Sequence, residues 1–209
     1  MTNIFKLTKA NRMADNQLRI GIYGGSFNPV HITHLLISEC FRDQMQLDKL
    51  LIIPTGISPF KAKFVGEPIS VHEAQPRLDM LRLAFAGNPH IEIDEFEIKT
   101  RTVCYTIDTL KYIREKYPDA KIFMLIGEDQ AEKFDKWKNC EQIREIATIC
   151  VAGRLGFPHT PPGFIPINSP YTDISSSMVR ERVRLRQTIK YIVPDKVAEY
   201  IFANGLYKD

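Results

Sequence analysis

The sequence predicts an α/β protein whose core is a doubly wound parallel sheet. Short, almost entirely apolar runs alternate with segments of helical periodicity, which is typical of a parallel sheet covered on both faces. The first apolar run, LRIGIY at 18–23, leads directly into a turn with two adjacent glycines. Open sheets of this class bind ligands at such turns, beyond the carboxyl ends of the strands. With 209 residues, 44% of them hydrophobic, the chain has the size of one domain.

The elements follow one another in a regular order. Strands are expected at 18–23, 49–54, 90–98, 121–127, 147–153 and 164–168. Helices are expected between them at 31–45, 71–87, 105–117 and 130–146. The last part, 172–209, changes character and predicts a small helical subregion of two consecutive helices, 171–187 and 194–207, with Pro194 in a first turn and Gly205 as a stop. We interpret 1–17 as a loosely ordered leader and 18–209 as a single domain.

Composition excludes several classes of function. A formal charge of +3 suits anionic small molecules but is too weak to indicate nucleic acid. Four scattered cysteines without a CxxC pair are typical of reduced thiols, which favours a cytoplasmic protein. No apolar stretch is long enough to span a bilayer, and none near the N-terminus resembles a signal peptide. We therefore expect no membrane partner, while a homo-oligomer stays open.

One connection, TGISPFKAKFVGEPIS at 55–70, is unusually long for a compact domain. Lys61 and Lys63 give it the capacity to bind anions. It is either a loop that covers substrate or a tolerated surface insertion, and the two lysines favour the first interpretation.

The glycine turn lies in the stretch GIYGGSFNPVHITHLL, 21–36. Glycine lets the backbone approach a ligand closely, and the helix that follows offers free N–H groups at its N-terminus. His31 and His34 fall on one face of its first turn, where they can donate to phosphate oxygens. The spacing does not fit GxGxxG, the pattern GxxxxGK[ST] is absent, and HxxH lacks a third zinc ligand. A phosphate is the favoured guest, and no protein metal site is expected; two ordinary surface histidines are the alternative.

A second candidate anion site is DISSSMVRERVR at 173–184. Consecutive serines favour a helix N-terminus, and Arg180 follows within the first turns. Hydroxyls, free N–H groups and a guanidinium together can bind the oxygens of a phosphate. A capped helix with a solvated basic face would have the same sequence. Together with the histidine-bearing turn, however, this segment predicts a polyphosphate held from both sides.

The segments GGSFNPVHITH and ISSSMVRERV resemble the first and last motifs of the HxGH-type nucleotidyltransferases, and specifically the nicotinate-nucleotide adenylyltransferases. The resemblance covers about 18–208. It implies a Rossmann-like nucleotidyltransferase fold, with ATP and Mg²⁺ as co-reactants. It also implies transfer of AMP to nicotinate mononucleotide, which gives nicotinate adenine dinucleotide (deamido-NAD) and pyrophosphate in NAD biosynthesis.

The resemblance also implies roles for individual residues. The catalytic residues would be His31, His34 and Arg180. The ATP-binding residues would be Gly24, Gly25, Ser26, Phe27, Gly127, Asp129, Ile174, Ser175, Ser176 and Ser177. The acceptor-binding residues would be Lys61, Thr106, Trp137 and Arg154. Trp137 is the only tryptophan of the chain, and its indole suits stacking on a pyridinium ring, although it could equally pack a helix onto the sheet.

The acceptor is less defined than the adenylyl transfer. Asn28 stands where many members carry aspartate, and Thr33 stands where the motif commonly has glycine. A nicotinamide-mononucleotide adenylyltransferase is therefore an alternative. A phosphopantetheine adenylyltransferase is another, although its acceptor has no aromatic ring for Trp137. A nucleotide sensor without turnover is an alternative of a different class.

Overall fold

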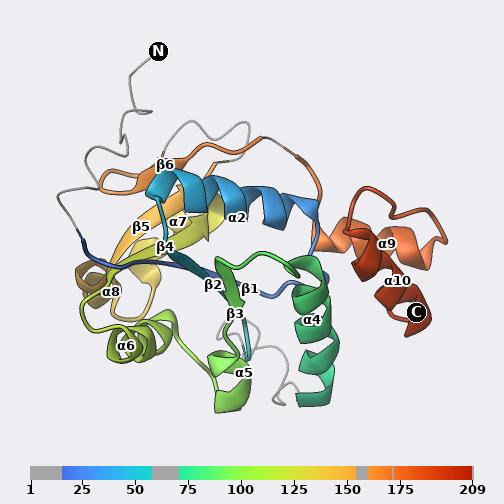
Figure 1. Cartoon of the computed structure of the whole chain (residues 1–209), viewed down its shortest axis with the longest axis horizontal. Helices are drawn as coiled ribbons and strands as arrows, with labels where there is room; N and C mark the ends of the chain where they lie inside the picture. The colour runs from blue at the N-terminus through green and yellow to red at the C-terminus, as the bar shows by residue number, and fades with distance from the viewer. Residues whose placement is uncertain (1–15, 58–70, 154–159, 171, 209) are drawn as a thin grey trace.

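The computed structural model describes residues 16–57, 71–153, 160–170 and 172–208 (Figure 1). Over these residues, six parallel strands form one sheet in the order β3-β2-β1-β4-β5-β6, which confirms the predicted doubly wound α/β fold. The strands are β1 (Arg19–Gly25), β2 (Lys49–Pro54), β3 (Ile91–Ile93), β4 (Lys121–Gly127), β5 (Ala147–Ala152) and β6 (Ile165–Ile167).

Helices connect the strands, and two helices follow the last strand. They are α2 (Ile32–Met45), α4 (Val71–Ala84), α5 (Phe96–Thr100), α6 (Thr106–Lys116), α7 (Glu128–Ala131), the 3₁₀ helix η1 (Phe134–Lys136), α8 (Cys140–Ile146), α9 (Ser176–Arg184) and α10 (Asp195–Ala203). No helix among the described residues is both long and apolar enough to cross a membrane.

Each face of the sheet has its own apolar core, because neighbouring strand residues point to opposite faces. In β2, Leu50 and Ile52 join the core with α2, α4, α9 and α10, whereas Leu51 and Ile53 join the core with α6 and α8. Figure 1 accordingly shows α6 and α8 across the sheet from α2. Gly21 lets α2 and the residues after it lie close to β1, since a Cβ there would collide with Leu47 and crowd Phe41 of α2.

Several predicted elements are shorter in the structure, among them the helices expected at 171–187 and 194–207, which are α9 and α10, and two elements differ in kind. The strand expected at 90–98 ends at Ile93, because the side chain of Asp94 accepts the N–H of Phe96 at 3.0 Å and starts α5. The helix expected at 130–146 is broken into α7, η1 and α8. The break before α8 lies at Trp137, which is extended, and at Asn139, which is left-handed with φ 56°.

The order of the strands creates a ligand-binding position. The chain builds the sheet outward from β1 through β2 to β3, and then returns to the other side of β1 to add β4, β5 and β6. The carboxyl ends of β1 and β4 therefore flank a topological switch point, where ligands bind in such sheets. The helices α9 and α10 lie at one end of the molecule, next to the start of α2 (Figure 1).

Part of what the sequence suggested lies outside the described residues. This applies to most of the leader, 1–15, and to Lys61 and Lys63 of the long connection. It also applies to Arg154, one of the expected acceptor ligands.

Candidate functional site

The turn that follows β1 is built around a buried aromatic ring. Phe27 has a positive φ of 46°, a conformation that L-residues rarely adopt. Its ring is 1% exposed and makes edge contacts with Tyr23, at 5.4 Å between centroids, and with His34, at 5.0 Å. Burial of this ring stabilises the turn, while Gly24 and Ser26 remain exposed to solvent. The backbone of the turn is therefore both fixed and accessible.

The two histidines lie together at the N-terminus of α2, as expected. His31 precedes the helix, and its backbone N–H donates to Nδ1 of His34 at 3.1 Å. The two rings are 3.8 Å apart, and desolvation together with the neighbouring His31 holds the pKa of His34 well below its usual value. A neutral imidazole whose Nδ1 accepts a hydrogen bond carries its proton on Nε2. His34 thus presents an uncharged N–H donor.

The serine-rich segment meets the same turn from the other end of the sequence. Ser175 caps α9 by accepting the N–H of Met178 at 3.2 Å. Ser176 Oγ donates to the carbonyl of Pro29 at 2.8 Å, and Arg180 Nη1 donates to the carbonyl of Asn28 at 2.7 Å. The N-termini of α2 and α9 therefore converge on one peptide segment, as the sequence predicted.

Arg180 retains donors beyond those contacts. Besides Asn28, its guanidinium donates to Ser177 Oγ at 3.1 Å. A guanidinium carries five N–H groups. The two contacts orient the group and leave capacity to bind an anion.

Three further contacts to this segment were missed by sequence reasoning. Tyr207 donates its hydroxyl to Oδ1 of Asn28, the hydroxyls of Thr33 and Thr172 share a hydrogen bond, and Ile32 N–H donates to the carbonyl of Ile192 at 3.0 Å. Burial raises the pKa of Tyr207 to about 12, so this hydroxyl remains a donor at neutral pH. No spacing in the sequence relates residues this far apart.

The end of β4 lies next to the end of β1, on the other side of the switch point. Because Tyr23 pairs with Leu125, the last residues of β1 and β4, Gly25 and Gly127, lie at the same edge of the sheet. Gly127 caps α7 and is followed by the exposed Asp129, which accepts Gln130 Nε2 at 2.9 Å. The structure therefore brings these two expected ATP ligands to the edge that carries the glycine turn.

Two acceptor candidates lie on neighbouring elements. Thr106 starts α6 and Trp137 ends η1, and the adjacent residues are in contact, because Lys138 Nζ lies 4.1 Å from the centre of the Tyr105 ring. Trp137 also packs against Phe134, with ring centroids 5.3 Å apart. Its Nε1 is buried and has no partner among the described residues. Trp137 therefore has a packing role, whether or not it also contacts a ligand.

The site combines helix N-termini, a guanidinium and a neutral imidazole donor, a set suited to a phosphorylated ligand. Over the part of the chain that the structure describes, no group of three or more His, Cys, Asp or Glu side chains could hold a metal ion.

Comparisons with known proteins agree with this chemistry. Residues 22–182 match the Cytidylyltransferase-like family. The chain is 37% identical to a protein of Thermomicrobium roseum named probable nicotinate-nucleotide adenylyltransferase, over 91% of this chain and 92% of that protein. It is 36% identical to a protein of the same name from Geobacillus thermodenitrificans, over 90% and 86%.

Solved structures share the fold. A Plasmodium falciparum nicotinic acid mononucleotide adenylyltransferase complexed with NaAD superposes with a TM-score of 0.75, at 20% identity, over 91% of this chain and 98% of that one.

The lowered pKa of His34 predicts a pH dependence of stability. Below pH about 6.5 the unfolded chain protonates this residue while the folded protein does not, so stability falls as the pH drops through that range, by up to about 1.4 kcal/mol per pH unit. His34→Asn, whose Oδ1 can replace Nδ1 as acceptor, removes this contribution. Urea unfolding at pH 7.5 and pH 5.5 measures it. Equal losses in the wild type and the variant would contradict the neutral state.

Proposed function

Because the chain belongs to the cytidylyltransferase-like family, and within it to the nicotinate-nucleotide adenylyltransferases, we propose that the site transfers AMP from ATP to nicotinate mononucleotide. The products are nicotinate adenine dinucleotide and pyrophosphate, in a step of NAD biosynthesis. The observation that carries the proposal is the convergence of α2 and α9 on the carbonyls of Asn28 and Pro29. This arrangement would direct the N-termini of both helices toward one phosphate chain.

The reaction needs positioning more than acid–base chemistry. The 5′-phosphate of the acceptor is ionised at neutral pH, so it attacks the α-phosphorus directly, without a general base. The leaving pyrophosphate develops negative charge as the bond to the α-phosphorus breaks. Donors fixed beforehand at those oxygens lower the barrier.

The ATP side of the site follows from the contacts of the turn. The main chain of Gly24, Gly25, Ser26 and Phe27 would line the nucleotide, while His34 Nε2–H, His31 and the remaining N–H groups of Arg180 would hold the phosphates. Gly127 and Asp129 lie at the same sheet edge and would meet the adenosine. The start of α9, Ile174, Ser175, Ser176 and Ser177, would close over the adenine and the triphosphate.

Mg²⁺ fits this proposal as a partner of the nucleotide rather than of the protein. Magnesium bound with ATP is commonly held by phosphate oxygens, water and one or two carboxylates. Asp129 is an exposed carboxylate at the nucleotide edge, and the described residues hold no acidic cluster. When bound, the ion would neutralise part of the charge on the phosphates.

The acceptor would lie between the start of α6 and the end of η1. Thr106 would contact the pyridine nucleotide and Trp137 would stack on its ring, with Lys61 and Arg154 as candidate contacts for its phosphate or carboxylate. We also propose a cytoplasmic location, supported by the absence of a disulfide among the four cysteines, all of which lie in the described ranges.

The substrate is tested by pyrophosphate release from ATP with three acceptors in parallel. We expect turnover with nicotinate mononucleotide to exceed that with nicotinamide mononucleotide, and none with phosphopantetheine. Faster turnover with the nicotinamide form would reassign the acceptor. ATP binding without pyrophosphate release from any mixture would indicate a sensor.

His34→Ala should lower kcat about 10²- to 10³-fold, because it removes a donor to charge that develops in the transition state. The KM for the acceptor should change far less. Steady-state kinetics with pyrophosphate detection measures both constants. His90→Ala is the control, since this exposed histidine precedes β3 at the opposite edge of the sheet and should leave both unchanged. A proportionate loss in kcat and acceptor affinity would contradict the assigned role.

Trp137→Ala should raise the KM for nicotinate mononucleotide about 2- to 30-fold, which corresponds to the energy of a cation on an indole face. The KM for ATP should stay nearly constant. Trp137→Phe keeps an aromatic ring against Phe134 and should give an intermediate acceptor KM. Thermal unfolding of both variants separates lost packing from lost binding. If the acceptor KM is unaffected by Trp137→Ala, the indole serves only the core.

A further inference from the structure

One peptide unit beyond β2 is held on both of its polar groups. The carbonyl of Thr55 accepts Nη1 of Arg77 at 2.9 Å, and the N–H of Gly56 donates to Oε2 of Glu97 at 3.4 Å. The same peptide segment also reaches the glycine turn, because Thr55 N–H donates to the carbonyl of Gly25 at 2.8 Å. This unit, which we call the 55–56 peptide, lies directly beside the expected ATP turn.

Arg77 links the 55–56 peptide to that turn. It comes from α4, is 6% exposed, and donates from the same Nη1 to the carbonyl of Ser26 at 2.9 Å. Its Nη2 is buried and has no hydrogen-bond partner among the described residues. Such a buried cation is costly unless its charge is compensated, and Glu97 is the acidic group whose charge acts on it. The arginine therefore adds to the pairing of β1 with β2 in holding the turn against the end of β2.

Glu97 links the 55–56 peptide to the acceptor side. Its Oε1 accepts the hydroxyl of Thr109 at 2.8 Å, and Thr109 lies on α6 one turn after Thr106. Burial raises the pKa of Glu97. Its hydrogen bonds and the charge of Arg77 lower this pKa and offset part of the effect of burial. Gly56 allows the close approach, because a Cβ there would collide with the backbone carbonyl of Glu97.

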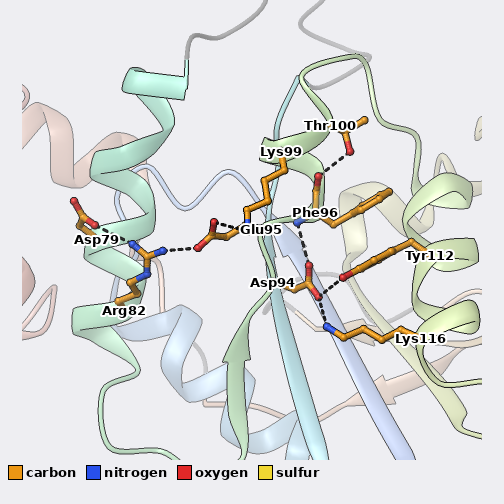
Figure 2. Close-up of polar contacts among 9 residues, drawn as sticks. All are labelled: Asp79, Arg82, Asp94, Glu95, Phe96, Lys99, Thr100, Tyr112 and Lys116. Atoms are coloured by element: carbon orange, nitrogen blue, oxygen red, sulfur yellow. Dashed lines mark hydrogen bonds and ion pairs between the residues drawn. The ribbon is translucent and has the colours of Figure 1, made fainter.

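The helix that carries Glu97 is itself anchored, as Figure 2 shows. Asp94, just before α5, accepts Tyr112 Oη at 3.2 Å and Lys116 Nζ at 3.0 Å, both from α6. The rings of Phe96 and Tyr112 stack with centroids 4.1 Å apart. On the other side, the half-exposed side chain of Arg82 of α4 forms an ion pair with Glu95, which contributes little to the anchoring. Glu97 is therefore presented from a segment that is held chiefly by α6.

We propose that Arg77 and Glu97 are positioning residues that set the spacing between the ATP turn and the acceptor helix α6 through the 55–56 peptide. The inference rests on the proposed function for the identity of the two ligands. Arg77 holds the ATP side of the peptide and Glu97 holds the acceptor side. Neither side chain touches the reacting atoms.

The test compares two conservative variants with matched controls. Arg77→Lys keeps the charge but replaces the rigidly held Nη1, which donates to both carbonyls, with a flexible ammonium, and it should raise the KM for ATP about 5- to 10-fold. Glu97→Gln replaces one acceptor oxygen with a donor, and it should raise the KM for nicotinate mononucleotide by a similar factor, with the KM for ATP within twofold of wild type. Steady-state pyrophosphate release measures both.

The controls are Arg82→Lys and Glu95→Gln, which alter an arginine of the same helix and a glutamate two residues from Glu97. Both residues form ion pairs away from the turn and should leave both KM values unchanged. A purely structural role would lower the melting temperature and the fraction of active enzyme in the Arg77 and Glu97 variants without changing either KM. That result would overturn the proposal.

Calorimetric titration of ATP separates this inference from the proposed function. If the wild type releases no pyrophosphate, the assigned reaction is wrong, but binding still reports on Arg77. A weaker ATP affinity in Arg77→Lys than in Arg82→Lys supports the positioning role. Equal affinities of these two variants overturn it.

Discussion

The site depends on two hydrogen bonds, which the carbonyls of Asn28 and Pro29 accept. Each accepts a hydrogen bond from α9, one from the charged Arg180 and one from the hydroxyl of Ser176. A hydrogen bond to a charged group contributes about 1.5–3 kcal/mol, more than a neutral one. Without these two hydrogen bonds, the N-termini of α2 and α9 would not be held toward a common point. Anion binding by two helix ends requires that both be held in place before the ligand arrives.

The state of His34 fits that requirement. Helix N-termini already provide partial positive charge, and Arg180 adds a full one. A charged imidazole at His34 would have to be desolvated, and His31, whose ring lies 3.8 Å away, would oppose the charge. The backbone N–H of His31 instead occupies Nδ1 of His34 and leaves the neutral Nε2–H as a donor. The site thus gains a directed hydrogen-bond donor without an additional positive charge.

Much of the fold could be predicted because it depends on local patterns. The apolar strands and the helix after the glycine turn follow from periodicity, and the observed α2 begins within one residue of its expected start. The region after β4 could not be predicted, because the extended Trp137 and the left-handed Asn139 interrupt a segment whose apolar spacing is helical throughout.

The candidate site, like the fold, could be predicted only in part. The histidines and the serine-rich helix carry recognisable chemistry in short segments, so they could be identified in advance. Arg77 donates to backbone carbonyls, Glu97 accepts a peptide N–H, and Tyr207 donates to the side-chain amide of Asn28. Nothing in the sequence around these three residues distinguishes them from surface residues. Their function becomes visible only when the sheet brings distant turns together.

The contacts that complete the turn join residues 28–33 to residues 172–207, and the separation reaches 179 residues for Asn28 and Tyr207. During synthesis the ribosome makes the glycine turn early and its binding partners very late. A nascent chain that has folded only its first strands therefore lacks a finished nucleotide cradle. Although ATP is abundant throughout translation, it would bind specifically to this polypeptide only once α9 and α10 have docked.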